Sequence, residues 1–321
     1  MRTLLFGLIF VSPPFLKAWL LRWFLGAEIG PRAEIGWFSA VLGRRVRLGA
    51  HSVVRPFTLI NVSGDVTLDA YAEISSFTLV YGAAGLSLGQ GSYIGPQSLL
   101  NTEEDVRIGA GSALGARSLV YTHGSFLPST EGYWVKLAGV TVGDKVWCAA
   151  GVFLHPGTEI GANSFVNSCA VVSGVIPPGS VVEGNPAKVV APMARLQRRM
   201  TPRHVDQALE HILREFAEIG LRRELGVAEV REAPRQLTFQ WRGQARAVLL
   251  IPSAGEPPVP PAHTVRPLYL VNLPAWTPPP GALVLDVTTL QTGYLADPLH
   301  TALRLFMLRY YGIRFLEAAP G

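Results

Sequence analysis

Apolar residues return at intervals of about six along the middle of the chain, and a small or β-branched residue follows each of them four positions later. Glycine often stands directly after the apolar residue, as in "IGAGS" and "IGANS". The positions that follow this pattern are Ile29, Ile35, Leu48, Val54, Leu68, Ile74, Leu88, Ile94, Ile108, Leu114, Val142, Cys148, Leu154, Ile160 and Val166. An amphipathic helix would place its apolar residues three or four positions apart, so the spacing excludes a helical repeat.

A period of six residues predicts a coil with three sides, each of them a short strand whose apolar residue points inward. A longer period supports this interpretation, because Leu48, Leu68, Leu88 and Ile108 follow one another at intervals of 20 residues. One turn of the coil therefore takes about 20 residues, and glycine or asparagine would supply unusual backbone angles at the corners. We predict a mainly β fold, a parallel β-helix of about seven coils over residues 27–190, with strands stacked about 4.8 Å apart.

The segment before the repeat, residues 1–26, contains two short apolar runs that Pro13, Pro14, Lys17 and Arg22 interrupt. A helix that spans a bilayer needs about 20 continuous apolar residues, and neither run reaches that length. Tryptophan, phenylalanine and leucine beside basic residues indicate an amphipathic helix. Such a helix either lies in a membrane interface or caps the end of the repeat.

The residues after the repeat, 191–321, predict a small α/β domain. Residues 201–220 have a helical apolar period, with Thr201 as N-cap and Gly220 as the stop. A hairpin that turns near Arg242 follows, then the strand-like runs "PLYLVNL" and "ALVLDV", and a closing helix capped by Asp297. We find no catalytic motif in this part, so structural packing and acceptor recognition are both open roles.

The repeat is similar to that of the left-handed β-helix acyltransferases with hexapeptide repeats. The motifs that carry the resemblance are "VGDKVW" (142–147) and "GNPAK" (184–188), within a repeat that covers about half of the chain. The closest resemblance is to O-acetyltransferases of the maltose, galactoside, streptogramin and colanic-acid type. It implies a left-handed coil, acetyl-CoA as co-substrate, and a homotrimer with active sites between neighbouring β-helices.

The six-residue period stops after Val120 and resumes only at Val142, and His123 stands at the break. The resemblance implies that His123 is the general base, which takes the proton of an acceptor hydroxyl in a direct transfer. Imidazole has an unperturbed pKa near 6.5, so it can accept a proton at neutral pH. Residues 124–139 would form a pocket wall, where Tyr133 and Trp134 stack on a sugar or on the pantetheine arm, or else pack on the neighbouring subunit.

The 20-residue turn also predicts neighbours for this histidine on the preceding coil. His123 would lie above Glu103, which could orient the imidazole, and Tyr121 would lie above Asn101. The resemblance implies that Asn101 contacts the acceptor, and Tyr121 belongs to the same expected acceptor site. The alternative is that "NTEED" (101–105) is a solvated corner.

The resemblance also implies a cofactor site. Ala149 and Ala150 would expose backbone groups to pantetheine, and Ser168 would contribute one coil later, unless it is an ordinary corner residue. Lys188, at the end of the β-helix, would contact the phosphates of CoA.

Composition limits the other classes of function. With 49% hydrophobic and 16% charged residues among 321, the chain can build a large core. The net charge of +5 is not gathered in a dense basic run, so we expect no nucleic-acid partner. Cys148 and Cys169 lie in no metal-like cluster, and His123 and His155 have no third histidine near them in the repeat. We therefore expect no metal, and exclude the zinc carbonic anhydrases that share this fold.

The leading hypothesis is an acetyl-CoA-dependent O-acetyltransferase acting on a sugar hydroxyl. The N-terminal segment directs it toward a cell-envelope or lipid-linked glycan intermediate, and we expect a cytoplasmic protein with peripheral contact on the inner face of the membrane. An N-acetyltransferase of an amino sugar and an enzyme with a longer acyl donor remain open. The alternative of a different class is a non-catalytic trimeric β-helix scaffold.

Overall fold

The computed structural model describes residues 2–124, 127–293 and 297–317. The chain divides into two compact units, Met1–Arg198 and Arg199–Gly321, and each is described by itself.

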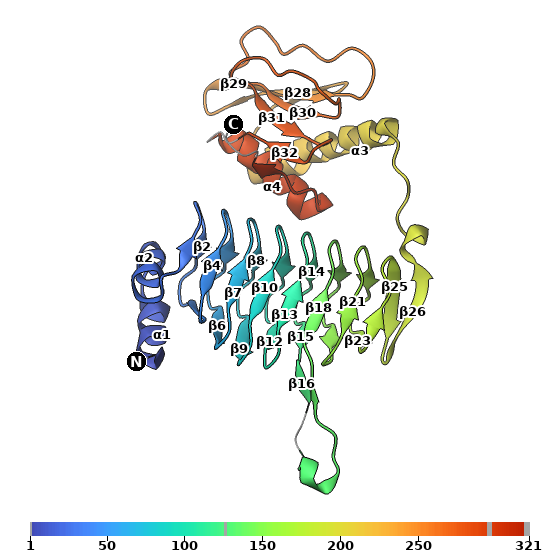
Figure 1. Ribbon diagram of the computed structural model, residues 1–321. Coiled ribbons are helices and arrows are strands. Elements are labelled where there is room, and N and C mark those ends of the chain that lie inside the picture. The colour runs from blue at the N-terminus through green and yellow to red at the C-terminus, as the bar shows by residue number, and fades with distance from the viewer. Residues whose placement is uncertain (1, 125–126, 294–296, 318–321) are drawn as a thin grey trace. The chain divides into compact units, whose positions relative to one another are not determined.

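Three largely parallel sheets form the body of the first unit, and the chain visits them in turn (Figure 1). The first sheet has the order β1 (Glu28–Ile29), β4 (Val46–Leu48), β7 (Val66–Leu68), β10 (Leu86–Leu88), β13 (Val106–Ile108), β18 (Val140–Val142), β21 (Glu159–Ile160) and β24 (Val175–Ile176). The second has the order β2 (Glu34–Ile35), β5 (Val53–Val54), β8 (Glu73–Ile74), β11 (Tyr93–Ile94), β14 (Ala113–Leu114), β19 (Trp147–Cys148), β22 (Phe165–Val166), β25 (Ser180–Gly184) and β26 (Ala187–Pro192). The third has β3 (Ala40–Leu42), β6 (Leu59–Val62), β9 (Leu79–Gly82), β12 (Leu99–Asn101), β15 (Leu119–Val120), β20 (Phe153–Leu154) and β23 (Val171–Val172).

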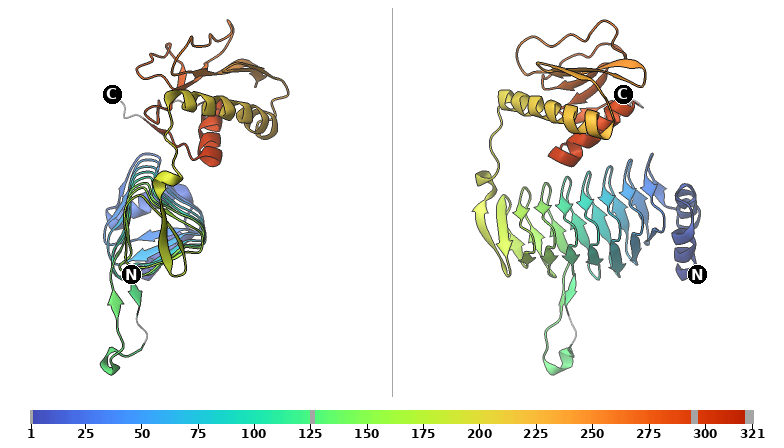
Figure 2. Two further views of the ribbon diagram at one scale, coloured as in Figure 1. Left: turned by 90° about the vertical axis from the view of Figure 1, so that its right-hand side faces the viewer. Right: turned by 180° about the vertical axis from the view of Figure 1, so that it is seen from behind.

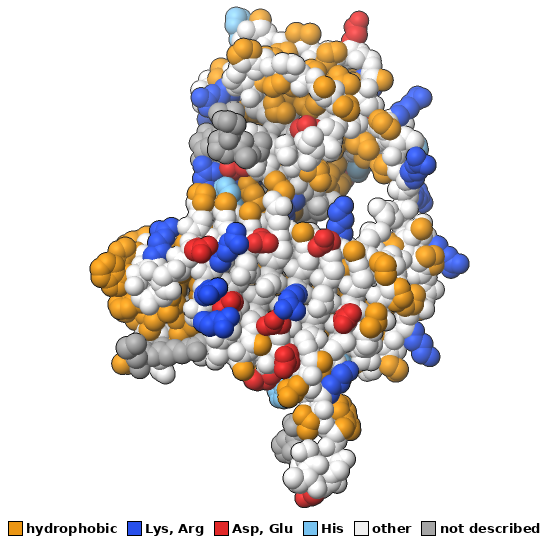
Figure 3. Space-filling view, in the orientation of Figure 1, with side chains coloured by type: hydrophobic (Ala, Val, Ile, Leu, Met, Phe, Trp, Pro, Cys, Tyr) orange, Lys and Arg blue, Asp and Glu red, His pale blue; other side chains and the backbone are white. Residues whose placement is uncertain are grey.

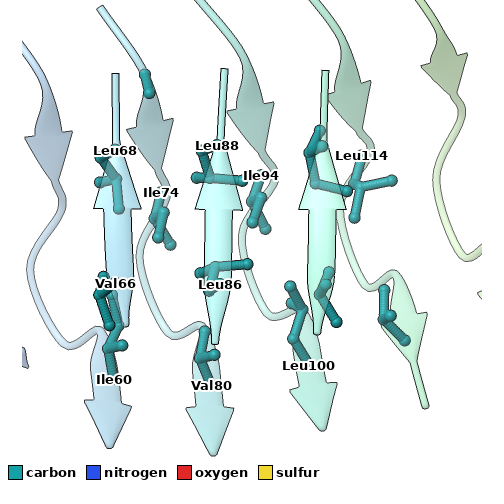
Figure 4. Close-up of a cluster of buried hydrophobic side chains, with 14 of the residues drawn as sticks. Ile60, Val66, Leu68, Ile74, Val80, Leu86, Leu88, Ile94, Leu100 and Leu114 are labelled. Carbon is teal, nitrogen blue, oxygen red and sulfur yellow. The ribbon is translucent and has the colours of Figure 1, made fainter. Parts of the chain in front are cut away.

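The strand register confirms the 20-residue period that the sequence predicts. Leu48 pairs with Leu68, Leu68 with Leu88, and Leu88 with Ile108. The repeat positions, with the exception of the half-buried Ile29, are buried between the three sheets, where they form one continuous core (Figure 4). A mainly β fold with parallel sheets is thus confirmed, while its left hand stays a prediction.

The glycine that follows the apolar residue allows the backbone of the next coil to approach closely; it is not there to adopt an unusual backbone angle. A Cβ atom added to Gly95 would lie 2.5 Å from the backbone nitrogen of Ala116 on the next coil. Left-handed angles occur instead at the corners, often without glycine, as at Phe57 (φ 61°) and Phe77 (φ 60°). The expectation that glycine and asparagine supply these corner angles is therefore wrong for many corners.

Two helices, α1 (Arg2–Val11) and α2 (Pro14–Leu25), lie at the first coil's end of the stack (Figures 1 and 2). Ile9 and Leu21 are buried and belong to the core of the β-helix. Lys17 is buried as well, and its ammonium group donates to the carbonyl oxygens of Gly36 and Ser39, both at 2.7 Å. These contacts fit the capping role. No described helix is long and apolar enough to cross a membrane.

The second unit holds a mixed sheet together with helices α3 (Pro202–Glu215) and α4 (Pro298–Tyr311). The sheet order is β27 (Val230–Ala233), β28 (Gln236–Trp241), β29 (Gln244–Ile251), β30 (Leu268–Val271), β31 (Leu283–Asp286), β32 (Gln291–Thr292) and β33 (Leu316–Glu317). The caps are confirmed, because Thr201 accepts from the His204 N–H and Asp297 accepts from the N–H groups of Leu299 and His300.

The predicted end of the first helix of this unit is wrong. The helix does not stop at Gly220 but continues as a π-helix, Phe216–Glu224. Leu221, one residue past the expected stop, is buried in the core of this unit, so its burial favours continuing the helix.

Candidate active site

The break in the repeat is a two-stranded ribbon that leaves the coil (Figures 1 and 2). Strand β16 (His123–Gly124) pairs antiparallel with β17 (Lys136–Leu137), so that His123 faces Leu137. Below the ribbon, the Ala138 N–H donates to the Thr122 carbonyl at 2.9 Å. A short 3-10 helix, η1 (Ser129–Glu131), lies near the tip, while residues 125–126 of the predicted loop lie outside the described residues. The coil resumes with β18 in register, since Ile108 pairs with Val142.

The imidazole of His123 is fixed by a buried amide. Its Nδ1 lies 2.9 Å from Oδ1 of Asn101, which ends β12 and is fully buried. The same oxygen accepts from the backbone N–H of Glu103 at 3.5 Å. A backbone N–H can only donate, so the oxygen is an acceptor and Nδ1 must be the donor. In the neutral ring Nε2 then keeps its lone pair, which is the state that a general base requires.

Glu103 lies on the preceding coil as predicted, but the hydrogen bond described for the imidazole goes to Asn101. The chain turns out of the coil at Thr122, whose Oγ1 accepts from the Glu104 N–H at 3.0 Å and lies 3.2 Å from Oδ1 of Asn101. This turn brings His123 toward the end of β12. Asn101, expected as an acceptor contact, thus holds the histidine, while an orienting role for the Glu103 side chain stays a prediction.

His123 lines a cleft of about 490 Å³ beside the ribbon. Its walls are mostly aromatic and aliphatic: Leu119, Tyr121, His123, Gly124, Leu127, Tyr133, Trp134, Phe153, His155 and Pro156. Tyr121 stacks on Phe153 with ring centroids 5.6 Å apart. The structure therefore brings three of the predicted acceptor residues, Tyr121, Tyr133 and Trp134, to one cleft with His123.

His155 also lines this cleft, a position that the repeat pattern does not predict. Its ring contacts Phe153 at a centroid distance of 4.6 Å. Burial, and then the positive charge of Lys136, lower the pKa of His155 below its ordinary value, which favours a neutral ring. The one available sequence signal was its position directly after β20, the strand stacked on β15.

The residues predicted for the cofactor lie at another part of the coil and do not line this cleft. Ala149 and Ala150 follow β19, and the Cys169 N–H donates to the Ala150 carbonyl at 3.0 Å. This bond places Ser168 beside the two alanines on the next coil. Ala150 and Ser168 are exposed, as is Lys188 on β26, the last strand of the same sheet. No cluster of potential metal ligands occurs within the described residues.

Comparison with known proteins supports the resemblance. No protein-family model matches this chain. A putative acetyltransferase of Saccharomyces cerevisiae is 47% identical over 51 residues, 16% of this chain and 26% of the relative. Galactoside O-acetyltransferase of Escherichia coli is 37% identical over 51 residues, 16% of this chain and 25% of the relative. The chain thus spans about a quarter of the length of these curated relatives.

A search of solved structures found a hexapeptide-repeat acetyltransferase of Vibrio cholerae with 19% sequence identity and a TM-score of 0.33, covering 60% of this chain and 88% of that chain. The predicted resemblance to the hexapeptide-repeat acetyltransferases, the galactoside O-acetyltransferase among them, is confirmed by the sequence matches.

Proposed function

We propose that the protein is an acetyl-CoA-dependent O-acetyltransferase that acts on a sugar hydroxyl of a cell-envelope or lipid-linked glycan intermediate. The observation that carries the proposal is the bond from His123 Nδ1 to Asn101, which leaves the lone pair on Nε2, in a residue that lines an aromatic cleft. We place the reaction in the cytoplasm. We also expect a homotrimer, with the site completed by a neighbouring subunit.

In the proposed reaction Nε2 of His123 takes the proton of the acceptor hydroxyl as its oxygen attacks. The thioester supplies the acetyl group: the new C–O bond forms, the C–S bond breaks, and the imidazolium returns its proton to the leaving sulfur. Asn101 supports this step, since Oδ1 accepts from Nδ1–H in the neutral ring and holds the same bond, now charge-assisted, in the imidazolium.

Two surfaces would hold the substrates. Tyr121, Tyr133 and Trp134 offer aromatic faces on which the apolar face of a sugar can stack. For acetyl-CoA, the small side chains of Ala150 and Ser168 fit an extended pantetheine arm because they leave exposed backbone within reach. Lys188 would pair with the phosphates.

The experiment is acetyl-CoA turnover by the wild type and by His123→Ala against free and lipid-linked sugars, with CoA binding measured in parallel. We expect the turnover rate of the variant to be roughly 10²- to 10⁴-fold lower than that of the wild type, with CoA binding unchanged. His263→Ala, which changes an exposed histidine of the second unit, is the matched control and should keep its rate. An active His123→Ala enzyme would refute the base assignment, and an absence of CoA binding in both proteins would favour the scaffold.

A further inference from the structure

The outward side of α1 and α2 carries large apolar side chains that no other part of the unit covers. These residues, here called the N-terminal apolar surface, are Leu4, Leu8, Val11, Phe15, Leu16, Trp19, Trp23 and Phe24. Phe15 is 79% exposed and Trp23 72% exposed, and Trp19 stacks on Trp23 at 5.8 Å. In Figure 3 apolar side chains dominate this end of the unit. A surface of this size that faces water marks an interaction site.

An apolar groove of about 430 Å³ opens into the same surface. Its lining contains no charged or polar side chain: Leu4, Leu5, Leu8, Phe24, Leu25, Leu42 and Gly43. Such a lining suits a hydrocarbon chain, because a polar ligand would lose its hydrogen bonds to water without replacement.

The sequence that forms this end of the first unit is basic. Residues 1–65 contain eight Lys or Arg and three acidic residues, a formal charge of +5, which equals that of the whole chain. No acidic residue occurs before Glu28. Arg44 and Arg45 directly follow Leu42 and Gly43 of the groove and are exposed; Arg44 is paired with Asp65 at 2.9 Å, and Arg45 is the cation we expect to meet the lipid. The partner of the surface should therefore be apolar at its centre and negative around it.

We propose that the N-terminal apolar surface docks onto an anionic lipid bilayer, with Phe15, Trp19 and Trp23 in the interface and the arginines at the phosphate head groups. A bilayer supplies both an apolar interior and negative phosphates. A two-fold contact with a second copy fits less well, because it would bring two patches of the same positive sign together. The inference deepens the proposed function, since it rests on an acceptor that is lipid-linked.

The docked orientation determines how far the active site lies from the lipid. In the third sheet β15, which precedes His123, lies four strands beyond β3 of the first coil. Four strand spacings of about 4.8 Å give roughly 20 Å, and the layer of helices adds about 10 Å. With the helix layer on the membrane, His123 would lie about 30 Å from the lipid. The acceptor hydroxyl would then belong to a glycan unit well removed from the lipid anchor.

The test is flotation of the full-length protein with vesicles of phosphatidylcholine alone and of phosphatidylcholine mixed with phosphatidylglycerol. We expect binding to the anionic vesicles that weakens with salt, because ionic screening reduces the attraction of the arginines. The double variant Phe15→Ser/Trp23→Ser should bind at least about 10-fold more weakly, since the exposed apolar side chains supply the insertion. Arg45→Glu should weaken anionic binding by about 5-fold or more.

The matched control is Val259→Ser/Leu305→Ser, which removes two exposed apolar side chains from the second unit and should bind as the wild type does. Thermal unfolding verifies that each variant is folded. The proposal is overturned if the wild type binds neither vesicle, or if Phe15→Ser/Trp23→Ser binds undiminished. Light scattering tests the alternative that the surface joins copies of the chain. The proposal is also overturned if the wild type is an assembly that does not bind vesicles and the double variant is a smaller species. Transfer to a soluble sugar without vesicles tests the proposed function separately, because lost transfer with intact flotation would refute only the catalysis.

Discussion

Asn101 offers the sharpest test of how the proposed base is held. In Asn101→Ala, Nδ1 of His123 loses a buried 2.9 Å hydrogen bond, so both the tautomer and the ring orientation become free. The bond is made to a group that gains positive charge during the reaction, for which about 1.5–3 kcal/mol is typical. Because 1.4 kcal/mol corresponds to tenfold, we expect kcat to fall by about 10- to 100-fold. KM for acetyl-CoA should stay unchanged.

The assay is release of free CoA, followed with a thiol reagent over a range of pH. Asn101→Asp gives a second readout, since a carboxylate beside Nδ1 favours the protonated ring. The base must be unprotonated to act, so the acid limb of the pH–rate profile should move to higher pH. Asn61→Ala is the matched control. Asn61 pairs with Tyr81, and Tyr81 pairs with Asn101, so Asn61 holds the same position in the third sheet two coils earlier, away from His123. An Asn101→Ala enzyme with unchanged kcat would refute the reasoning.

Three further predictions concern the stack and the cleft. Burial lowers the pKa of Lys17 in the folded chain to about 8, from 10.5 for the free side chain. Between these two pH values the unfolded chain binds more protons than the folded chain, so the free energy of unfolding should rise with pH. Melting temperatures of the wild type and Lys17→Met over this range check it, because the variant should lack the rise. Gly95→Ala forces a Cβ atom to 2.5 Å from the Ala116 nitrogen and should lower the free energy of unfolding by about 1–3 kcal/mol. Gly7→Ala is the control: its Cβ atom would lie in open space within α1, and the higher helix propensity of alanine should stabilise the protein by up to about 1 kcal/mol. Chemical denaturation measures both, and a stable Gly95→Ala protein would contradict the stacking argument. Trp134→Ala should raise KM for the sugar about 10-fold without changing KM for acetyl-CoA, as initial rates at varied acceptor will show.

The stack was predictable because its constraints are local and repeat along the chain. Each coil needs an inward apolar residue and a small residue after it, so the pairing of Leu88 with Ile108 follows from spacing alone. The break was equally visible, since a ribbon that leaves the coil cannot keep the period. The site's detail was less accessible: the turn at Thr122 sets which residue of the preceding coil meets His123, and side-chain spacing does not encode that turn.

Two other features could not be predicted from the sequence, for different reasons. His155 follows a strand as many corner residues do, and its place in the cleft depends on the ribbon folding beside it. Lys17 lies between apolar residues like a charged group on an interfacial helix, yet it is buried because the short helix α2 lies across the end of the first coil. Both positions depend on contacts between segments that are far apart in the sequence.

The ribbon is closed at its base, where the Ala138 N–H meets the Thr122 carbonyl and His123 pairs with Leu137. The coils before and after it stay in register, with Ile108 opposite Val142. Extra residues at the tip would therefore add only the entropy of a longer loop, which grows slowly with length. We therefore expect the segment between β16 and β17 to accept insertions without disturbing the stack or the bond between His123 and Asn101. New acceptor preferences could arise there while the proton-transfer machinery is inherited intact.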